Sequence, residues 1–544
     1  MKKNFFTKAV VIIATVYLII IPSKIYGEEN SGIREYPEAS KEEKINENPP
    51  YSISDLHFKR IAATRNVYNM GLLMNELSLN YNIFEGNTNL YPKQAVRGNA
   101  SLKHIGQEVK ITNNSAQVSE DYIQIGNFYP YATYDLEFNG KSGKFIYKFG
   151  DDKNSLKLIF SISGKTLNIS KVETLNKKEG QEIHLTAITD ITDDSFNIRL
   201  QFSGAFGHDY QIYISTYYNG HTTYKYSVPL SINTTHIAEI ENYKWHVGAE
   251  TKTGQEIGIN KAKCWYGNGF GQADPHPVNF EDGSPVIKDG KLFFSVSFRS
   301  ADILGILSLN INTMEWKCEG IVLYELDGKI CNYIASTIIY QRDKRIWSLF
   351  TPAHGGEHVI YYGESNKNPL FGLTHVRLSM LDYNEVKGDE DISVFYDKDA
   401  DMWYAAYAKL INGHYSISLC KSGSVSGKYE EIANTGNEPF NVTGINIQKI
   451  GGKRYVLCGS DKGYLIFSFP KLEFLGKFNV DFEDGGYRGW GTVVPFPDGI
   501  GTKYLWLTFD RGKGNGGYNW SYGGLYLYRS AERNEGYEYP LTDF

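Results

Sequence analysis

The stretch Asp391-Ile-Ser-Val-Phe-Tyr-Asp397-Lys-Asp-Ala-Asp401-Met-Trp-Tyr-Ala-Ala-Tyr407 has the pattern of a β-hairpin with a carboxylate at its leading end. Apolar and aromatic residues alternate with period two on both sides of an Asp-rich segment, which is typical of a turn. We therefore predict two antiparallel strands, with Asp397, Asp399 and Asp401 in the turn between them.

Four other stretches in the second half of the chain repeat this order of apolar strand, polar turn and aromatic strand. Their equivalent positions are spaced by 54, 57, 52 and 49 residues, at Lys291, Arg345, Met402, Arg454 and Lys503. A period of this length is typical of propeller blades. Five copies over residues 244–544 predict a five-bladed β-propeller, in which each copy supplies the two inner strands of a four-stranded blade.

Residues 91–243 contain short alternating runs separated by Asn, Gly and Asp, such as Tyr122-Ile-Gln-Ile-Gly and Lys144-Phe-Ile-Tyr-Lys-Phe. This pattern predicts a β-sandwich of the jelly-roll kind. In a secreted protein such a domain is often a carbohydrate-binding module, and a structural domain that braces its neighbour is the equal alternative. The fold class is therefore all-β, an N-terminal sandwich followed by a propeller, which agrees with 41 Tyr and 54 Gly against 6 Met.

The N-terminal region has the order of a secretory signal peptide over residues 1–27, with Lys2 and Lys3 before an apolar run. An uncleaved membrane anchor is the alternative. Residues 28–53 are rich in Glu, Lys, Asn, Ser and Pro, which predicts a disordered linker. Apolar residues at helical spacing from Leu56 to Leu77 predict a helix within residues 54–90. We expect a protein that is secreted or held at the cell surface, with no membrane contact after cleavage.

The charge balance argues against nucleic acid or an anionic membrane as a partner, because 56 basic and 62 acidic residues give a net charge of −6. The five cysteines have no CxxC spacing, so neither a disulfide framework nor a zinc site is expected. The stretch His354-Gly-Gly-Glu357-His358 favours a loop, whereas histidines four residues apart need a helix to share a metal. We expect no cofactor, and the sequence leaves open whether a structural calcium ion occupies the propeller channel.

Propeller geometry nominates site residues, because the strands that line the channel all begin at one mouth, where the loops after the second strands also open. Carboxylates, cations and aromatic rings there suit an oligo- or polysaccharide, by hydrogen bonding and ring stacking. The candidate substrate-binding residues are Arg299, His354, Arg488, Trp490, Asp510, Arg511 and Trp520. The candidate carboxylates are Asp274 or Asp282, Asp391, Glu438 and Glu357.

The stretch from Asp391 to Tyr404 resembles the Asp-Pro-x-x-Phe-x-Asp-x-Asp-Gly-x-x-Tyr blade element of arabinanase and β-xylosidase-like propeller glycoside hydrolases, relatives of the invertase and levansucrase group. Asp274-Pro275-His276-Pro277 is similar to their opening Asp-Pro element. The resemblance covers about residues 263–530, the C-terminal half. It implies a five-bladed catalytic propeller with an Asp base or nucleophile, a second Asp that orients and tunes its partner, and a Glu general acid.

By this resemblance Asp391 is the tuning residue, and Asp274 is the base or nucleophile, with Asp282 as its rival. The acid is missing from its expected place, because the fourth blade reads Thr443-Gly444-Ile445 where the family has Glu-Gly-Pro. Glu438 and Glu357 are the available substitutes. The leading hypothesis is a secreted glycoside hydrolase; the alternatives are a carbohydrate-binding protein that has lost its acid and a surface protein that binds other proteins.

Overall fold

The computed structural model describes side chains or backbone in a defined set of segments. They are residues 53, 56–63, 71–77, 96–97, 100–105, 108–113, 116–151, 153–164, 166–175, 189–190, 195–203, 211–218, 221–229, 235–267, 271–299, 303–353, 359–383, 388–436, 438–478, 490–497, 502–509, 525–532 and 542–543.

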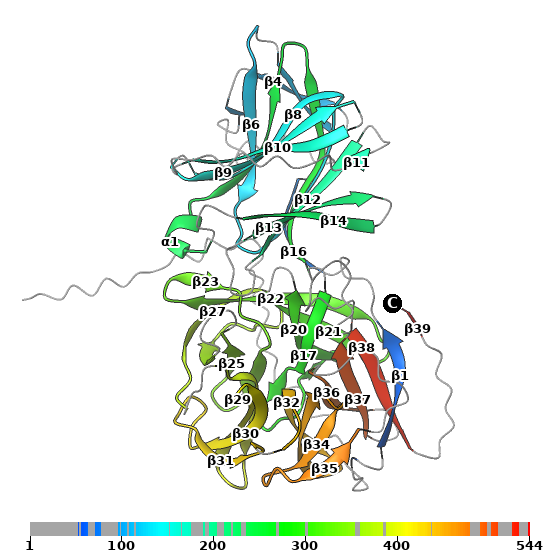
Figure 1. Cartoon of the computed structure of the whole chain (residues 1–544), viewed down its shortest axis with the longest axis vertical. Helices are drawn as coiled ribbons and strands as arrows, with labels where there is room; N and C mark the ends of the chain where they lie inside the picture. Colours follow the sequence, from blue (N-terminus) through cyan, green and yellow to red (C-terminus); the bar gives the residue numbers. More distant parts are fainter. Residues whose placement is uncertain are drawn as a thin grey trace, which may run out of the picture. The chain divides into compact units, whose positions relative to one another are not determined.

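The second half of the chain, together with one strand from the N-terminal region, forms five β-sheet blades of four strands each around a channel (Figure 1). Blade 1 contains β17 (Gly271–Pro277), β20 (Lys291–Arg299), β21 (Ile303–Asn310) and β22 (Trp316–Leu326). Blade 2 contains β24 (Thr337–Gln341), β25 (Ile346–Pro352), β26 (Ile360–Ser365) and β27 (Gly372–Met380). Blade 3 contains β28 (Glu390–Asp397), β29 (Met402–Ile411), β30 (His414–Ser422) and β31 (Glu430–Asn434). Blade 4 contains β32 (Val442–Ile450), β33 (Lys453–Ser460), β34 (Leu465–Ser468) and β35 (Phe474–Lys477).

Blade 5 contains β36 (Thr492–Pro497), β37 (Thr502–Phe509), β38 (Leu525–Glu532) and, as its fourth strand, β1 (Leu56–Ala63) from the N-terminal region. The first strands contact one another in a closed ring, from β17 to β24, β28, β32, β36 and back to β17. The predicted five-bladed propeller is therefore confirmed. The short strand β39 (Thr542–Asp543) pairs with β1.

The predicted hairpins form because their turns contain residues that suit them. Asp397 accepts hydrogen bonds from the backbone N–H groups of Asp399 (3.0 Å) and Ala400 (3.2 Å), and Asp401 adopts a left-handed conformation (φ 50°). Asp side chains favour this arrangement because they imitate a backbone turn. The structure thus places Asp399 and Asp401 in the turn and Asp397 at the end of β28, where its side chain bonds to the turn.

The helix predicted from Leu56 to Leu77 is wrong, because two strands occupy this region. They are β1 and β2 (Gly71–Leu77). A bulge between Arg60 and Ala62 interrupts the alternation of β1, so the buried residues Leu56, Phe58 and Ile61 fall at irregular spacing. The irregular spacing imitated helical periodicity. The strand pairs antiparallel with β38, which lies at the other end of the sequence (Figure 1).

Blades 1 and 2 are joined into one continuous sheet at both their outer and inner edges. Outside, β22 pairs parallel with β27; inside, β18 (Asn279–Phe280) pairs parallel with β24. Two further short strands, β19 (Ile287–Lys288) and β23 (Lys329–Cys331), extend hairpins of blade 1. Pairing on both edges encloses a shared apolar core that includes Tyr324, Ile338 and Trp347.

Two further sheets lie between β1 and β17 in the sequence. One has seven strands in the order β11 (Thr189–Asp190), β10 (Thr166–Leu175), β9 (Ser155–Ser163), β8 (Ser142–Gly150), β15 (Lys244–Thr251), β6 (Ser119–Asn127) and β3 (Val96–Arg97). The other has the order β14 (His221–Pro229), β13 (Gln211–Tyr218), β12 (Ser195–Ser203), β7 (Thr133–Asn139), β16 (Glu256–Gly267), β5 (Glu108–Asn113) and β4 (Ala100–Ile105), with β2 also paired to β16. A single turn of helix, α1 (Ile237–Ile240), precedes β15.

The two sheets face each other, as a sandwich requires. The rings of Phe138 and Phe145, one from each sheet, stack at 4.2 Å, and the Tyr147 hydroxyl donates to the backbone oxygen of Ile198 across the core (2.8 Å). Because β15 and β16 are members of these sheets, the sandwich extends to Gly267. The boundary expected at residue 243 lies too early, since the pattern of these two strands does not differ from that of the propeller strands.

Candidate functional site

Three inner strands of the propeller carry the same irregularity near their leading ends. In β17 the pairing passes from Ala273–Ser297 to His276–Ser295, so two residues face one on the partner strand. The same two-against-one count occurs in β28 between Glu390 and Ser393, and in β32 between Thr443 and Asn446. This is a β-bulge.

The first bulged residue is left-handed in each case: Asp274 (φ 52°), Asp391 (φ 57°) and Gly444 (φ 63°). Ala335 (φ 57°) takes the same conformation just before β24. This region favours Gly, and among other residues Asp and Asn tolerate it best. Backbone strain of this kind clusters at functional sites. The fold therefore marks Asp274 and Asp391 as equivalent positions, in blades 1 and 3, at the same mouth of the channel.

Blade 4 holds the Asp391 carboxylate in place. Its Oδ2 atom accepts hydrogen bonds from the Thr443 hydroxyl (2.5 Å) and the backbone N–H of Gly444 (2.8 Å), and Asp391 is buried. A side chain at Gly444 is excluded by Trp490, whose Cα would lie 2.3 Å from the added Cβ. Two donors on one oxygen fix the orientation of the carboxyl group.

A second layer of buried polar residues lies two positions further along each inner strand. It consists of His276, Thr337, Ser393, Asn446 and Thr492. The His276 Nε2 atom is 3.4 Å from Asn446 Nδ2 and 3.5 Å from Thr337 Oγ1, and its ring meets Trp490 edge-on at 5.1 Å. Burial lowers the pKa of His276 from 6.5 to about 3, so this ring is neutral.

This layer does not suit a calcium ion. Calcium takes six to eight oxygen ligands, usually with carboxylates among them. The layer offers an imidazole, an amide and hydroxyl groups, and the described part of the chain contains no cluster of three or more His, Cys, Asp or Glu side chains able to hold a metal.

The rival carboxylate Asp282 lies at the far end of the channel from Asp391. The backbone N–H of Tyr396, at the end of β28, donates to the oxygen of Glu281. Five residues separate Asp391 from Tyr396, which is about 16 Å along a strand. The inner strand of blade 1 is β17 and not the segment after Asp282, so of the two rivals only Asp274 leads an inner strand.

Glu438 is exposed on the connection that leads from β31 into β32, and its backbone N–H donates to the oxygen of Thr435. Trp490 is 1% exposed and forms part of the channel wall, so it does not offer the sugar-stacking surface that the sequence predicted. Arg299 ends β20, and only its backbone is described. The other candidates lie outside the described residues: His354, Glu357, Arg488, Asp510, Arg511 and Trp520.

Three residues of the site cannot be recognised from the sequence pattern alone. In the sequence, Thr443 and Gly444 are departures from a motif, and His276 is part of Asp-Pro-His-Pro. One sequence pattern does mark these positions. In four blades, a small residue or Asp near the start of the inner strand stands two positions before a polar residue. These residues are Asp274, Ala335, Asp391 and Gly444.

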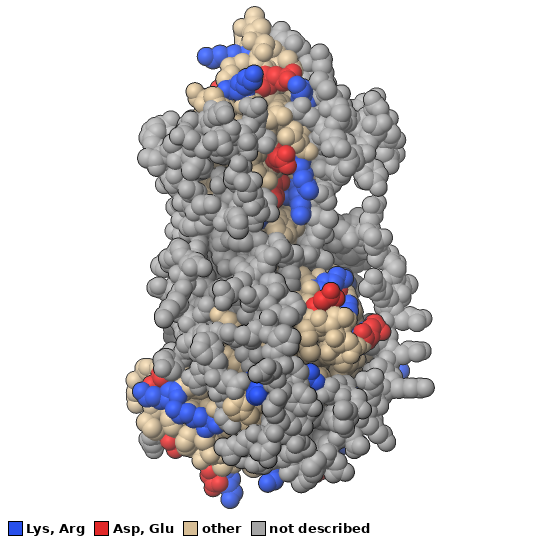
Figure 2. All heavy atoms as spheres, turned by 90° about the vertical axis from the view of Figure 1, so that its right-hand side faces the viewer, with Lys and Arg blue, Asp and Glu red and all other residues tan. Residues whose placement is uncertain are grey.

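Charges of both signs lie side by side on the described part of the face in Figure 2. Within the described residues, no helix has the length and hydropathy needed to cross a bilayer.

No model of a protein family matches this sequence, and no curated protein sequence matches it. Among solved structures, the chain is similar to a thermostable family-43 glycoside hydrolase at 15% identity over 48% of this chain and 88% of that one, with a TM-score of 0.32. It is similar to the catalytic domain of a family-62 α-L-arabinofuranosidase from Coprinopsis cinerea (14% identity, 48% and 92% covered, TM-score 0.33) and to a family-32 β-fructofuranosidase from Bombyx mori (16% identity, 48% and 60% covered, TM-score 0.33). These likenesses concern the fold of about half the chain.

Proposed function

We propose that the propeller is the catalytic domain of a glycoside hydrolase in which Asp274 acts as base or nucleophile and Asp391 orients and tunes the reacting groups. The observation that carries this proposal is the equivalence of the two residues. Each is a strained, left-handed aspartate on a β-bulge at the same mouth of the channel. Glycoside hydrolysis needs two carboxyl groups across the scissile bond, about 5–5.5 Å apart for retention or about 6.5–9.5 Å for inversion.

The surroundings of Asp391 suit a residue that keeps a fixed orientation during the reaction. Its hydrogen bonds from Thr443 and Gly444 hold the carboxyl group in place, so it would orient and tune its partner or stabilise the positive charge that develops on the sugar ring. Asp274 would then act directly on the substrate, as base or nucleophile. The substrate is an oligo- or polysaccharide. The proton donor is a carboxyl group from another position, because position 443 is a threonine.

The test is digestion of a glycan panel by the full chain, compared with Asp274→Asn and Asp391→Asn. Loss of a general acid or base typically costs about 10²- to 10⁴-fold in rate, so Asp274→Asn should lose at least about 10²-fold. Asp391→Asn should also lower the rate, because the tuning residue is lost. Asp399→Asn, in the turn at the opposite end of the same hairpin, is the matched control and should retain activity. Equal activity in all three variants would remove both aspartates from the mechanism.

A second candidate function is glycan binding without hydrolysis, which is favoured by one observation. Thr443 stands where the sequence resemblance requires a general acid, and its hydroxyl group is committed to Asp391. Binding of a glycan by the wild-type chain with no turnover, and weaker binding after Asp391→Ala, would support this alternative.

We also propose that the chain is secreted or displayed at the cell surface, as residues 1–27 suggest, and that the sandwich binds carbohydrate or braces the propeller. Within the described part of the sandwich, no aromatic side chain is among the exposed large apolar residues, which favours bracing. N-terminal sequencing of protein recovered from the medium would test secretion, with a start near Glu28 as the expected result.

A further inference from the structure

The segment after β17 leaves blade 1 and contacts three other blades at the far end of the channel. We call this segment, residues 278–284, the tie. Its strand β18 pairs with β24 of blade 2, and the Glu281 N–H donates to the backbone oxygen of Tyr340 in the same blade (3.2 Å). The Glu281 oxygen accepts the N–H of Tyr396 from blade 3 (2.6 Å). Three inner strands are thus joined through the tie by backbone hydrogen bonds.

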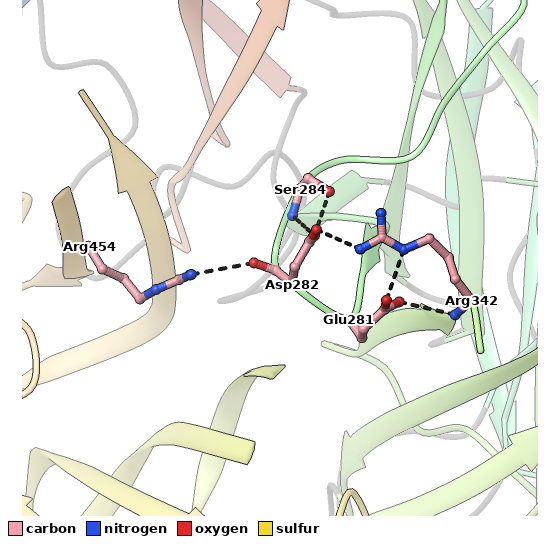
Figure 3. Close-up of polar contacts among 5 residues, drawn as sticks. All are labelled: Glu281, Asp282, Ser284, Arg342 and Arg454. Carbon is pink, nitrogen blue, oxygen red and sulfur yellow. Dashed lines mark hydrogen bonds and ion pairs between the residues drawn. The ribbon is translucent and has the colours of Figure 1, made fainter. Parts of the chain in front are cut away.

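An ion-pair network fixes the tie to blade 2 (Figure 3). Arg342 donates from Nε to Glu281 (2.8 Å), from its backbone N–H to the other oxygen of that carboxylate (3.1 Å) and from its guanidinium to Asp282 (2.6 Å). Ser284 donates to Asp282 from its backbone and its hydroxyl. Burial acts to raise the pKa of Asp282, but the hydrogen bonds from Ser284 and Arg342 outweigh it and lower the pKa below its usual value. Charge-assisted bonds of this kind are geometrically specific.

Blade 4 reaches the tie through Arg454. Its guanidinium donates to the backbone oxygen of Asp282 (3.5 Å) and lies 3.7 Å from the ring centroid of Phe395 in blade 3. Gly283 is left-handed (φ 84°), and a Cβ there would lie 3.3 Å from the Arg454 guanidinium. Four of the five blades therefore meet at this short segment.

We propose that the tie sets the relative height of the inner strands along the channel and thereby holds Asp274 and Asp391 at their working separation. The two ends of each inner strand are mechanically linked, because a strand has a nearly fixed rise of about 3.3 Å per residue. β17 runs from Asp274 to the tie, and β28 runs from Asp391 to Tyr396, which is bonded to it. Glu281, Asp282, Arg342 and Arg454 are positioning residues in this arrangement, and their catalytic effect rests on the proposed function.

Amide hydrogen exchange tests the mechanical link without any substrate. In Arg342→Ala, the exchange of peptides that contain Gly444, whose N–H donates to Asp391, should accelerate at least about tenfold. Arg342→Lys should restore part of the protection. The matched control is Arg377→Ala, in the outer strand of the same blade, where Arg377 is exposed and pairs with Glu325 (3.2 Å). It should leave the Gly444 peptides unchanged.

Acceleration confined to the tie and residues 340–345 would overturn the proposal, because the far end would then be independent of the mouth. If Arg342→Ala does not fold, Glu281→Gln and Asp282→Asn each remove one carboxylate partner of Arg342. The exchange of the Gly444 peptides is then measured in these two variants, with the same expected outcome.

Kinetics provide the second measurement. Arg342→Ala should lower kcat about tenfold or more with little change in KM, since displacement of the reacting groups by about 1 Å can cost about 10²-fold. A rise in KM alone would contradict a positioning role. If the wild-type chain cleaves no glycan, the proposed function fails, whereas the exchange experiment still decides whether the tie is linked to the mouth.

Discussion

Thr443 donates its hydroxyl hydrogen bond to the Asp391 carboxyl group at the mouth of the channel. A hydroxyl occupies the position where the resemblance requires a carboxyl group, and it bonds to the aspartate of the neighbouring blade. We predict that Thr443→Val, which removes this donor and keeps the shape, lowers glycan turnover about tenfold or more and costs about 1–3 kcal/mol of stability, because it leaves the buried Asp391 oxygen with one donor fewer. Thr443→Ser, which keeps the hydroxyl, should retain most of both properties in parallel kinetic and urea-unfolding measurements. Equal loss in the Ser variant would mean that the methyl contacts matter and the hydrogen bond does not.

His276 should make the stability of the protein depend on pH. Its pKa is about 3 in the folded chain and near 6.5 when unfolded, so below about pH 6.5 only the unfolded state takes up this proton. Stability should therefore fall as the pH drops from 6.5 toward 3, by about 1.4 kcal/mol per pH unit from this group. His276→Gln should show a correspondingly shallower fall in urea unfolding between pH 6 and pH 4.

The slope of the unfolding free energy against pH is compared between the wild-type chain and His276→Gln. The contribution of the carboxylates cancels, because it is common to both proteins. His414→Gln, at a partly buried histidine bonded to the Phe440 oxygen, controls for the general effect of replacing a histidine, and each variant is compared with the wild-type slope. If His276→Gln kept that slope, His276 would not be the source of the pH dependence.

Single residues also show where sequence reasoning reached its limit. Asp391 could be singled out because it leads a strand with clear alternation, and Asp397, Asp399 and Asp401 were assigned to the turn by their chemistry. The choice between Asp274 and Asp282 could not be made, because β17 is interrupted by a bulge and by prolines, whereas the segment after Asp282 imitates a regular strand. The end of the channel at which a residue lies depends on contacts with other blades, and a local sequence pattern does not predict these contacts.

At the scale of elements, β1 is the strand that the sequence could not place. Its partner β38 is nearly the whole chain away, so no hairpin pattern in the sequence predicts the pairing. The bulge in β1 also interrupts the alternation of apolar residues that would indicate a strand. The inner hairpins of blades 2 to 5, by contrast, are local, and the sequence predicts them; in blade 1 the inner strand is β17 and not the predicted segment after Asp282. Phe58 of β1 is fully buried among aromatic residues of blades 4 and 5, with ring centroids 5.8 Å from Phe478 and 6.2 Å from Trp506.

We predict that Phe58→Ala destabilises the propeller by about 3–5 kcal/mol, the usual cost of removing a buried aromatic ring. Phe474→Ala, at a phenylalanine that is 41% exposed on β35, is the matched control and should cost less than about 1 kcal/mol. Thermal unfolding followed by tryptophan fluorescence gives both values. A Phe58→Ala protein as stable as the Phe474→Ala protein would show that β1 is dispensable.

At the scale of the whole molecule, the sandwich is an insertion in the propeller. The chain leaves blade 5 after β1 and enters blade 1 at β17, which is an ordinary passage from one blade to the next. Elsewhere such passages are short, as from Asn434 to Val442 and from Met380 to Glu390. The sandwich strands therefore replace a loop.

We predict that replacing residues 64–270 by a flexible linker of about eight to ten residues leaves a propeller that folds. The reason is that the ring of inner strands and the fourth strand of blade 5 would both be retained. Far-UV circular dichroism and a cooperative thermal transition would show folding. A shortened chain that begins at residue 244 retains the five hairpins but lacks β1, and it should be unstable or aggregate. If the two chains behaved alike, the role of β1 in closing the ring would be refuted.

The pairing of Leu56 with Glu532 has a consequence for biosynthesis. At a typical rate of about 5–20 residues per second, the ribosome makes β1 roughly half a minute to a minute and a half before it makes β38. Throughout that interval the apolar face of β1 has no native partner, and blade 5 cannot be completed. The propeller thus cannot close before β38 has been made, so a chaperone has that whole interval in which to bind a still-open chain.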